Sequence, residues 1–267
     1  MRFIIVNLLL PFFTSVIGFS QIPTLNHNAF TDGEEITYKV YYNWKFVWVP
    51  TGEVTFFTTE TDSAYEVRVV GMSYPSYDSV FKVSDNYITR IDKSTLKPIY
   101  FRRDIEEGSY IRYDSLKFDH DDLSVEEYFG RTKDVAKYFK FDTKENVLDM
   151  LSAIYLMRGI DFGKKAEETS IPFRIFFDKE LLELDIHFRG LETSKLKSVG
   201  KVSTWHMQAD LIGGNIFDDG DVMDIWVSND GNNIPMQIES PIKFGSIKAV
   251  LKSVKGSKFN FDFDITD

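Results

Sequence analysis

Two acidic turns offer the densest groups of side chains that could bind a metal ion. Asp218-Asp219-Gly220-Asp221, followed by Asp224, supplies several carboxylate oxygens, and calcium takes about six to eight oxygen ligands. The run lacks the spacing of an EF-hand loop and its closing glutamate. Asp119-His120-Asp121-Asp122 is the second acidic turn. Aspartate and glycine are common in turns for conformational reasons, so the sequence predicts solvated turns and no metal site.

The histidines do not form a metal-binding pattern either. The chain has 4 of them, and none belongs to a His-x-x-x-His or His-x-His pair. A histidine site would need partners that folding brings together from distant segments. The histidines are His27, His120, His187 and His206.

Carboxylate chemistry is the catalytic class that the residue types leave open. With 41 acidic residues, some pair will lie at the roughly 5 to 9 Å separation that glycoside hydrolases use. The chain has no cysteine, which excludes a thiol nucleophile. It also has no Gly-x-Ser-x-Gly, Ser-x-x-Lys or P-loop motif. The sequence therefore assigns no catalytic residue and predicts no cofactor.

Aromatic side chains are the remaining candidates for a binding site. They make up 15% of the chain and are dense around one predicted turn. Exposed, such a cluster would bind a lipid tail, a glycan or a protein, whereas buried aromatics simply fill a core. Both interpretations remain open at this stage. The candidate ligand-binding residues are Tyr42, Trp44, Trp48, Tyr77 and Phe81.

The elements that must position these residues are mostly strands. Residues 35–42 and 182–188 alternate apolar and polar side chains, which is typical of half-buried strands. Similar short runs, separated by turn residues, recur along most of the chain. This spacing predicts a mainly β protein built as an antiparallel sandwich, roll or barrel.

One segment has helical periodicity. Apolar residues recur at intervals of three and four between Val147 and Tyr155, and Gly159 stands where a helix would stop. Asp142 or Thr143 could cap its start. The sequence predicts one inserted helix over residues 143–158, packed as a brace against the sheet.

The first twenty residues have the pattern of a signal peptide. Arg2 precedes an apolar run, and small residues at Gly18 and Ser20 precede Gln21. We expect a signal peptide over 1–20, an extended leader over 21–31 and a single domain over 32–267. No later segment is apolar for the roughly 20 residues that a membrane span needs. The net charge of −10 argues against nucleic acid or an anionic membrane surface as a partner.

Several segments, taken in order, resemble domain of unknown function 3108, a family of exported bacterial proteins. The matching stretches are 32–40 with 52–54, 84–92, 148–158, 225–230 with 234–235, and 245–249. The resemblance implies a mainly β fold, with a curved antiparallel sheet, roll or half-open barrel and one inserted helix, in a Gram-negative periplasm or cell envelope. It implies no activity, cofactor or site residue. On the helix, Asp149, Tyr155 and Arg158 are candidates for a structural polar cluster.

The leading hypothesis is a non-enzymatic envelope protein that binds an apolar or amphipathic, lipid-like ligand or an envelope protein through a concave aromatic sheet. An apolar pocket would support it, and a fully packed interior would contradict it. The alternatives are a carboxylate-dependent glycan hydrolase and a structural scaffold. The hydrolase needs facing carboxylates in a cleft, one with a raised pKa, and the scaffold needs a flat apolar patch.

Overall fold

The structure is a computed structural model that describes residues 29–45, 47–165, 170–196, 200–211, 218 and 220–260. The predicted signal peptide, residues 1–20, and leader residues 21–28 lie outside the described residues. Two residues at the end of the predicted leader, Ala29 and Phe30, are described and are buried.

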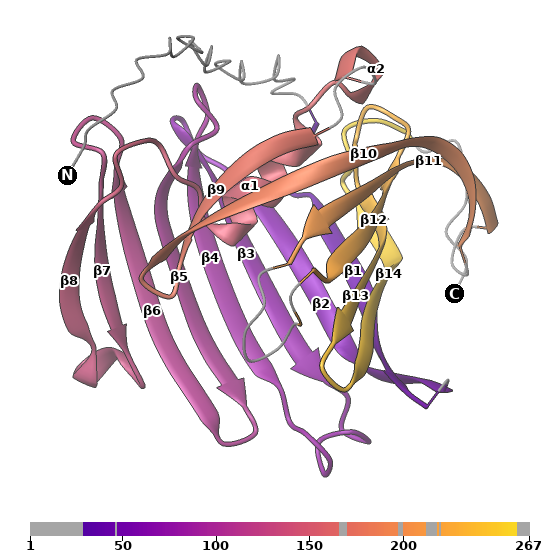
Figure 1. The fold of residues 1–267 in the computed structure, drawn as a ribbon, viewed down its shortest axis with the longest axis horizontal. Helices are drawn as coiled ribbons and strands as arrows, with labels where there is room; N and C mark the ends of the chain where they lie inside the picture. The colour runs from indigo at the N-terminus through magenta and orange to yellow at the C-terminus, as the bar shows by residue number, and fades with distance from the viewer. Residues whose placement is uncertain are drawn as a thin grey trace, which may run out of the picture.

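The described chain forms one 14-stranded antiparallel sheet, strongly curved in Figure 1. The strands are β1 (Glu35–Trp44), β2 (Val47–Glu60), β3 (Ala64–Ser73), β4 (Ser84–Asp92), β5 (Pro98–Glu107), β6 (Tyr110–Asp119), β7 (Ser124–Gly130), β8 (Lys137–Asp142), β9 (Ser170–Phe177), β10 (Glu180–Leu196), β11 (Gly200–Asp210), β12 (Val222–Ser228), β13 (Pro235–Ile242) and β14 (Gly245–Lys255).

The topology consists of two meanders joined at one seam. Strands β1 to β8 pair in sequence order, and so do β9 to β14. The meanders meet where β1 pairs with β14, with Ile36 opposite Val254. Strands β8 and β9 are the two edges and do not pair with each other. The sheet is therefore open, as the predicted half-open architecture requires.

The link between the two edges carries the helices across the concave side of the sheet (Figure 1). Helix α1 (Met150–Arg158) is followed by the short α2 (Phe162–Lys165), and a 3-10 turn, η1 (Lys133–Val135), precedes β8. No described helix has the length and hydropathy needed to cross a bilayer.

The predicted helix exists, but it begins later than residue 143. Leu148 forms a parallel bridge with Ile175 of β9, accepting from the N–H of Phe176 and donating to the carbonyl of Arg174. A residue that uses its backbone groups in this way is extended, so the helix starts at Met150. Strand β8 was not predicted from the sequence, because its six residues are only half-buried or exposed and give no clear alternation.

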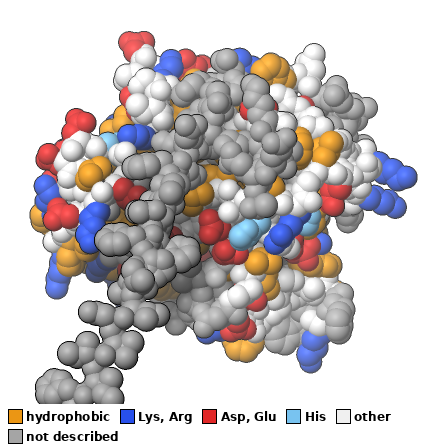
Figure 2. All heavy atoms as spheres, turned by 45° about the horizontal axis from the view of Figure 1, so that its top comes forward, with side chains coloured by type: hydrophobic (Ala, Val, Ile, Leu, Met, Phe, Trp, Pro, Cys, Tyr) orange, Lys and Arg blue, Asp and Glu red, His pale blue; other side chains and the backbone are white. Residues whose placement is uncertain are grey.

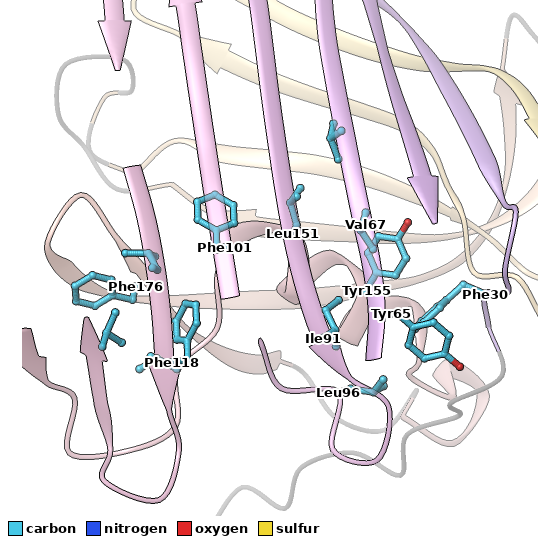
Figure 3. Packing of buried hydrophobic residues seen from close by; sticks show 14 of the residues in the cluster. Phe30, Tyr65, Val67, Ile91, Leu96, Phe101, Phe118, Leu151, Tyr155 and Phe176 are labelled. Carbon is cyan, nitrogen blue, oxygen red and sulfur yellow. The ribbon is translucent and has the colours of Figure 1, made fainter. Parts of the chain in front are cut away.

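Helix α1 is buried on two sides, because it lies between the two meanders. Leu151 and Tyr155 pack with Val67 and Phe101 of the first meander, as Figure 3 shows. From the other side of the helix, Ala153, Met157 and the residues after it pack with β9, β11 and β12. A helix enclosed in this way carries apolar residues around most of its circumference.

The helix begins at a buried carboxylate. Asp149 Oδ1 accepts hydrogen bonds from the N–H groups of Leu151 and Ser152, at 2.8 and 3.0 Å. The Ser152 hydroxyl in turn accepts from the Asp149 N–H at 3.0 Å, which completes a capping box. Asp149 Oδ2 accepts from the Thr89 hydroxyl of β4 at 2.8 Å. One side chain thus caps the helix and ties it to the sheet.

The helix ends at a buried ion pair. The Arg158 guanidinium donates two hydrogen bonds to the Glu34 carboxylate, at 2.7 and 2.8 Å, and both side chains are almost fully buried. It also donates to the carbonyls of Ala29 at 3.0 Å and Asn232 at 3.2 Å. The side chain of Asn233 donates to the carbonyl of Arg158 itself at 2.7 Å. The N-terminal segment, the helix and the β12–β13 loop are therefore held together at one point.

We expect Glu34→Gln to lower the free energy of unfolding by about 3–5 kcal/mol, because it leaves a buried, uncompensated guanidinium. Glu35→Gln is the matched control, since Glu35 pairs at 2.8 Å with Lys255, whose side chain is 69% exposed. The control should cost less than about 1 kcal/mol. Urea unfolding followed by circular dichroism measures both. Equal losses of unfolding free energy in the two variants would show that the buried ion pair contributes no more to stability than the exposed one.

Candidate ligand-binding cavity

An apolar cavity of about 150 Å³ lies between α1 and the concave face of β1, β2, β13 and β14. Its walls are carbon atoms almost throughout. The lining residues are Ile36, Tyr38, Val54, Phe56, Ile154, Tyr155, Arg158, Pro235, Ile238 and Ala249.

Strand pairing explains why these side chains meet. Alternate residues of a strand share one face, so Ile36 and Tyr38 of β1 point the same way. Ile36 is opposite Phe56 of β2, and Tyr38 is opposite Val54. The rings of Tyr38 and Phe56 pack edge to face with centroids 5.7 Å apart. Two neighbouring strands thus contribute a continuous apolar wall, and α1 closes the space.

Three polar side chains border the cavity, and two of them are already hydrogen-bonded. The hydroxyls of Tyr155 and Thr58 are 2.7 Å apart, and Arg158 is paired with Glu34. The hydroxyl of Tyr38 has no hydrogen-bond partner among the described residues, although only 6% of Tyr38 is exposed. Burial raises the pKa of Tyr38, while the positive charge of Arg158 acts in the opposite sense. The Tyr38 hydroxyl is thus a neutral group with a free donor.

The volume limits what this cavity can hold. Pockets for drug-sized ligands usually measure roughly 300–1,000 Å³, so 150 Å³ is too small for a whole lipid. An engineered apolar cavity of about 150 Å³ binds benzene. The space therefore suits one aromatic ring or the end of a short alkyl chain.

A second feature is a cluster of buried charged side chains from β5, β6 and β7, which meets the turn that joins β9 to β10. Arg103 donates through Nε to Asp114 at 3.1 Å and also contacts Asp178. The Arg103 guanidinium stacks 4.3 Å from the ring centre of Phe177. Glu127 lies beside Asp114 and is fully buried.

Glu127 is the carboxyl group with the most perturbed environment in this cluster. Burial, and then the negative charge of Asp114, raise the pKa of Glu127 to about 8. Neither Glu127 oxygen, nor Asp114 Oδ1, has a donor among the described residues. A proton retained on Glu127 supplies the missing donor, so we infer that Glu127 is largely protonated at neutral pH. Burial likewise raises the pKa of Asp85, whose neighbour is Glu107, to about 7.

This cluster meets only one of the two requirements of a carboxylate-dependent hydrolase. A raised pKa suits a general acid. Asp114 and Glu127 are 1% and 0% exposed, however, so a sugar cannot reach them as they stand. Within the described ranges, no three His, Asp or Glu side chains are grouped so that they could hold a metal ion.

The aromatic residues singled out in the sequence lie at another place, where β1, β2 and the β3–β4 connection approach the rim of the sheet. The Tyr42 hydroxyl donates to the carbonyl of Phe244 at 2.6 Å. The ammonium of Lys248 lies 4.2 Å from the centre of the Trp48 ring. Tyr77 is half-buried and Phe81 is 46% exposed. None of these four residues lines the cavity. The side chain of Trp44 lies outside the described part. Their role in binding stays a prediction.

Of the polar residues predicted on the helix, two lie together and one lies apart. The Arg158 guanidinium is 5.3 Å from the ring centre of Tyr155, at the end of the helix that borders the cavity. Asp149 lies at the opposite end, where burial raises its pKa and the hydrogen bonds from Ser152 and Thr89 lower it. The residues therefore fasten the helix at two separate points.

Sequence reasoning did not single out Tyr38 and Phe56, which form the cavity wall. Both lie in segments with the expected strand pattern, so their orientation toward one face was available. Which inward residues face a space, and which face a packed neighbour, depends on the position of the helix above them. That position is a tertiary property.

The raised pKa of Glu127 predicts a specific pH dependence of stability. Its folded-state pKa, about 8, exceeds the ordinary value of 4.5. Between these values the folded state holds the extra proton, so stability falls as the pH rises, by up to about 1.4 kcal/mol per pH unit. Glu127→Gln mimics the protonated form, and should flatten the slope between pH 5 and 8 and raise stability at pH 9. Asp85 should leave a residual slope.

Glu126→Gln, at the adjacent half-buried position of β7, is the matched control and should keep the wild-type slope. Urea titrations at several pH values measure all three proteins. A wild-type slope in the Glu127→Gln variant would mean that Glu127 is ionised in the folded protein.

Comparisons with known proteins place the chain by sequence and by fold. It is similar to a β-barrel-like protein of Brucella abortus that contains domain of unknown function DUF1849, with a TM-score of 0.59 and 9% identity over 83% of this chain and 96% of that one. This likeness concerns the fold alone.

A Bacteroides fragilis protein described as exported, with a YmcC-like fold, is matched at 11% identity over 87% of this chain and 99% of that one. Its TM-score of 0.36 is too low to support an argument. No curated protein matches the chain. The model of the protein of unknown function family DUF3108 matches residues 37–252. The chain therefore belongs to the DUF3108 family.

Proposed function

We propose that this is a non-enzymatic protein of the bacterial cell envelope that binds a small apolar or amphipathic ligand. The observation that carries the proposal is the apolar cavity of about 150 Å³ with the unpaired hydroxyl of Tyr38 in its wall. An empty space in a protein interior costs stability, because the atoms around it lose their contacts. A ligand that fills it recovers those contacts.

The lining defines the chemical class of the ligand. Its buried end must be apolar, because the walls carry few polar atoms. It gains from one hydrogen-bond acceptor that reaches Tyr38. It does not need a negative charge, because Glu34 already neutralises Arg158. A ring or short alkyl chain with one oxygen fits this description, and the end of a longer amphipathic molecule fits it equally.

The predicted signal peptide over residues 1–20 supports export to the periplasm or cell envelope. The hydrolase alternative is weaker, since the carboxyl groups with raised pKa values are enclosed.

Benzene and 1-pentanol test the cavity directly. We expect both to shift the NMR signals of Ile36, Val54 and Ile154 in the wild-type protein. Ala249→Leu fills the space and should abolish both effects. Tyr38→Phe removes only the hydroxyl, so it should weaken pentanol binding by about 2- to 10-fold, the value of one neutral hydrogen bond, and leave benzene unchanged.

Thr193→Leu is the control, because it adds the same side chain at an exposed position of β10. Absence of any shift around the cavity in the wild type would contradict the proposal. Where the shifts are observed, native mass spectrometry of protein purified from its own envelope, followed by extraction, would identify the natural ligand. A co-purifying molecule with an acyl chain would define the amphipathic case.

A further inference from the structure

The most exposed large apolar side chains of the described residues share one end of the molecule. They are Phe244 at 74%, Val80 at 72%, and Val47 and Val135 at 61%. Phe244, Val80 and Val135 lie in the β13–β14, β3–β4 and β7–β8 connections, and Val47 is the first residue of β2, directly after the β1–β2 connection. These connections all lie at the lower end of the sheet in Figure 1. We call this surface the apolar end.

Contacts between neighbouring connections hold part of the apolar end in place. The Tyr42 hydroxyl of β1 bonds to the carbonyl of Phe244, which joins the β1–β2 and β13–β14 hairpins. The N–H of Tyr74, after β3, donates to the carbonyl of Thr51 in β2 at 2.8 Å. The tips that carry Phe244, Val47 and Val80 therefore project from neighbouring connections that are bonded to one another.

Lysines flank every one of these tips. Lys243 precedes Phe244, Lys82 follows Val80, and Lys45 precedes Val47. Lys133 and Lys137 lie on either side of Val135. All five lysines are exposed.

Acidic residues also occur at this end, but fewer of them than lysines lie next to the four apolar side chains. Asp78 accepts from the Ser73 hydroxyl, and Asp134 is the neighbour of Val135. The β5–β6 hairpin carries Glu106 and Glu107, and Glu107 forms a bridge with Val83, next to Lys82 of the β3–β4 tip. The net charge of −10 argued against an anionic membrane surface for the chain as a whole, but it does not describe these four tips, where lysines outnumber acidic residues.

The opposite end of the sheet has different connections. The exposed residues of the β2–β3, β4–β5 and β6–β7 turns are polar, and include Asp62, Ser94, Thr95, Asp121 and Asp122. Figure 2, which turns this side forward, shows charged groups of both signs spread over it. Ordinary turn chemistry accounts for such residues. It does not account for exposed valine and phenylalanine at four separate tips.

We propose that the apolar end docks on the surface of a bilayer that contains anionic lipids. Single apolar side chains on separate loops can each enter the interface between headgroups and acyl chains. Neighbouring lysines keep their charge at the headgroups while their stems lie along apolar surface. Each lysine near an anionic surface adds about 1 kcal/mol. A protein partner would instead favour a contiguous flat patch. This inference does not depend on the cavity being occupied.

Vesicle flotation with the full chain tests the proposal. Vesicles of phosphatidylcholine with phosphatidylglycerol should carry the protein upward, and those of phosphatidylcholine alone should carry much less. Val47→Ser/Val80→Ser/Phe244→Ser should weaken partitioning at least about tenfold, since it removes three apolar side chains that the bilayer would bury. Lys45→Gln/Lys82→Gln/Lys243→Gln should weaken it roughly 100-fold on the anionic vesicles and remove most of the salt dependence.

The matched control is Phe57→Ser/Ile99→Ser/Leu191→Ser, which removes exposed apolar groups elsewhere and should stay within about twofold of the wild type. All variants share one N-terminus, so any contribution of residues 1–20 is common to them. The proposal is overturned if the wild type does not float with the anionic vesicles. It is also overturned if the variant with serine at Val47, Val80 and Phe244 floats as well as the control. A wild type that forms dimers, with that variant monomeric, would assign the end to self-association instead.

Discussion

The buried ion pair between Arg158 and Glu34 is the constraint around which this fold is arranged. Two opposite charges taken out of water cost several kcal/mol each unless their hydrogen bonds are satisfied. Here the carboxylate and two backbone carbonyls accept hydrogen bonds from the guanidinium. Because these acceptors come from the segment before β1 and from the β12–β13 loop, the end of the helix is bonded to two segments that are distant in the sequence.

The cavity and the enclosed carboxyl group follow from the same arrangement. A helix fixed at both ends by polar side chains cannot slide to fill every gap beneath it. Pro235 and Ala249, which line the space, have short side chains, and a void remains beside Tyr38. Farther along the sheet, the β9–β10 turn covers Asp114 and Glu127, where burial favours the neutral form of one carboxyl group. The two features differ in chemistry, but both depend on what lies across the concave face.

Much of the architecture could be predicted from the sequence, and the reasons are local. Alternation in segments such as 35–42 is a property of single strands, so the β class was predictable from the residues. The curved, open form of the sheet was expected only from the resemblance to the family. The start of α1 was not, because Leu148 is drawn into a bridge with Ile175, a contact made through tertiary packing. Strand β8 was missed for a related reason, since an edge strand with little buried surface gives a weak pattern. For the site, Arg158 and Tyr155 were identified on the helix, but the partner Glu34 lies 124 residues away and no spacing links them.

The pairing of β1 with β14 has a consequence for the order in which the chain acquires its structure. Most neighbouring strands form hairpins, whose residues are close in sequence, but this seam joins residues about 200 positions apart. Loop closure over such a distance is slow. During vectorial synthesis, β1 and β2 emerge long before β14, leaving the backbone groups of β1 as an unprotected edge. Unpaired edges promote association between chains. Newly made molecules thus spend an interval in which another protein could cover β1, and the last strand ends that interval.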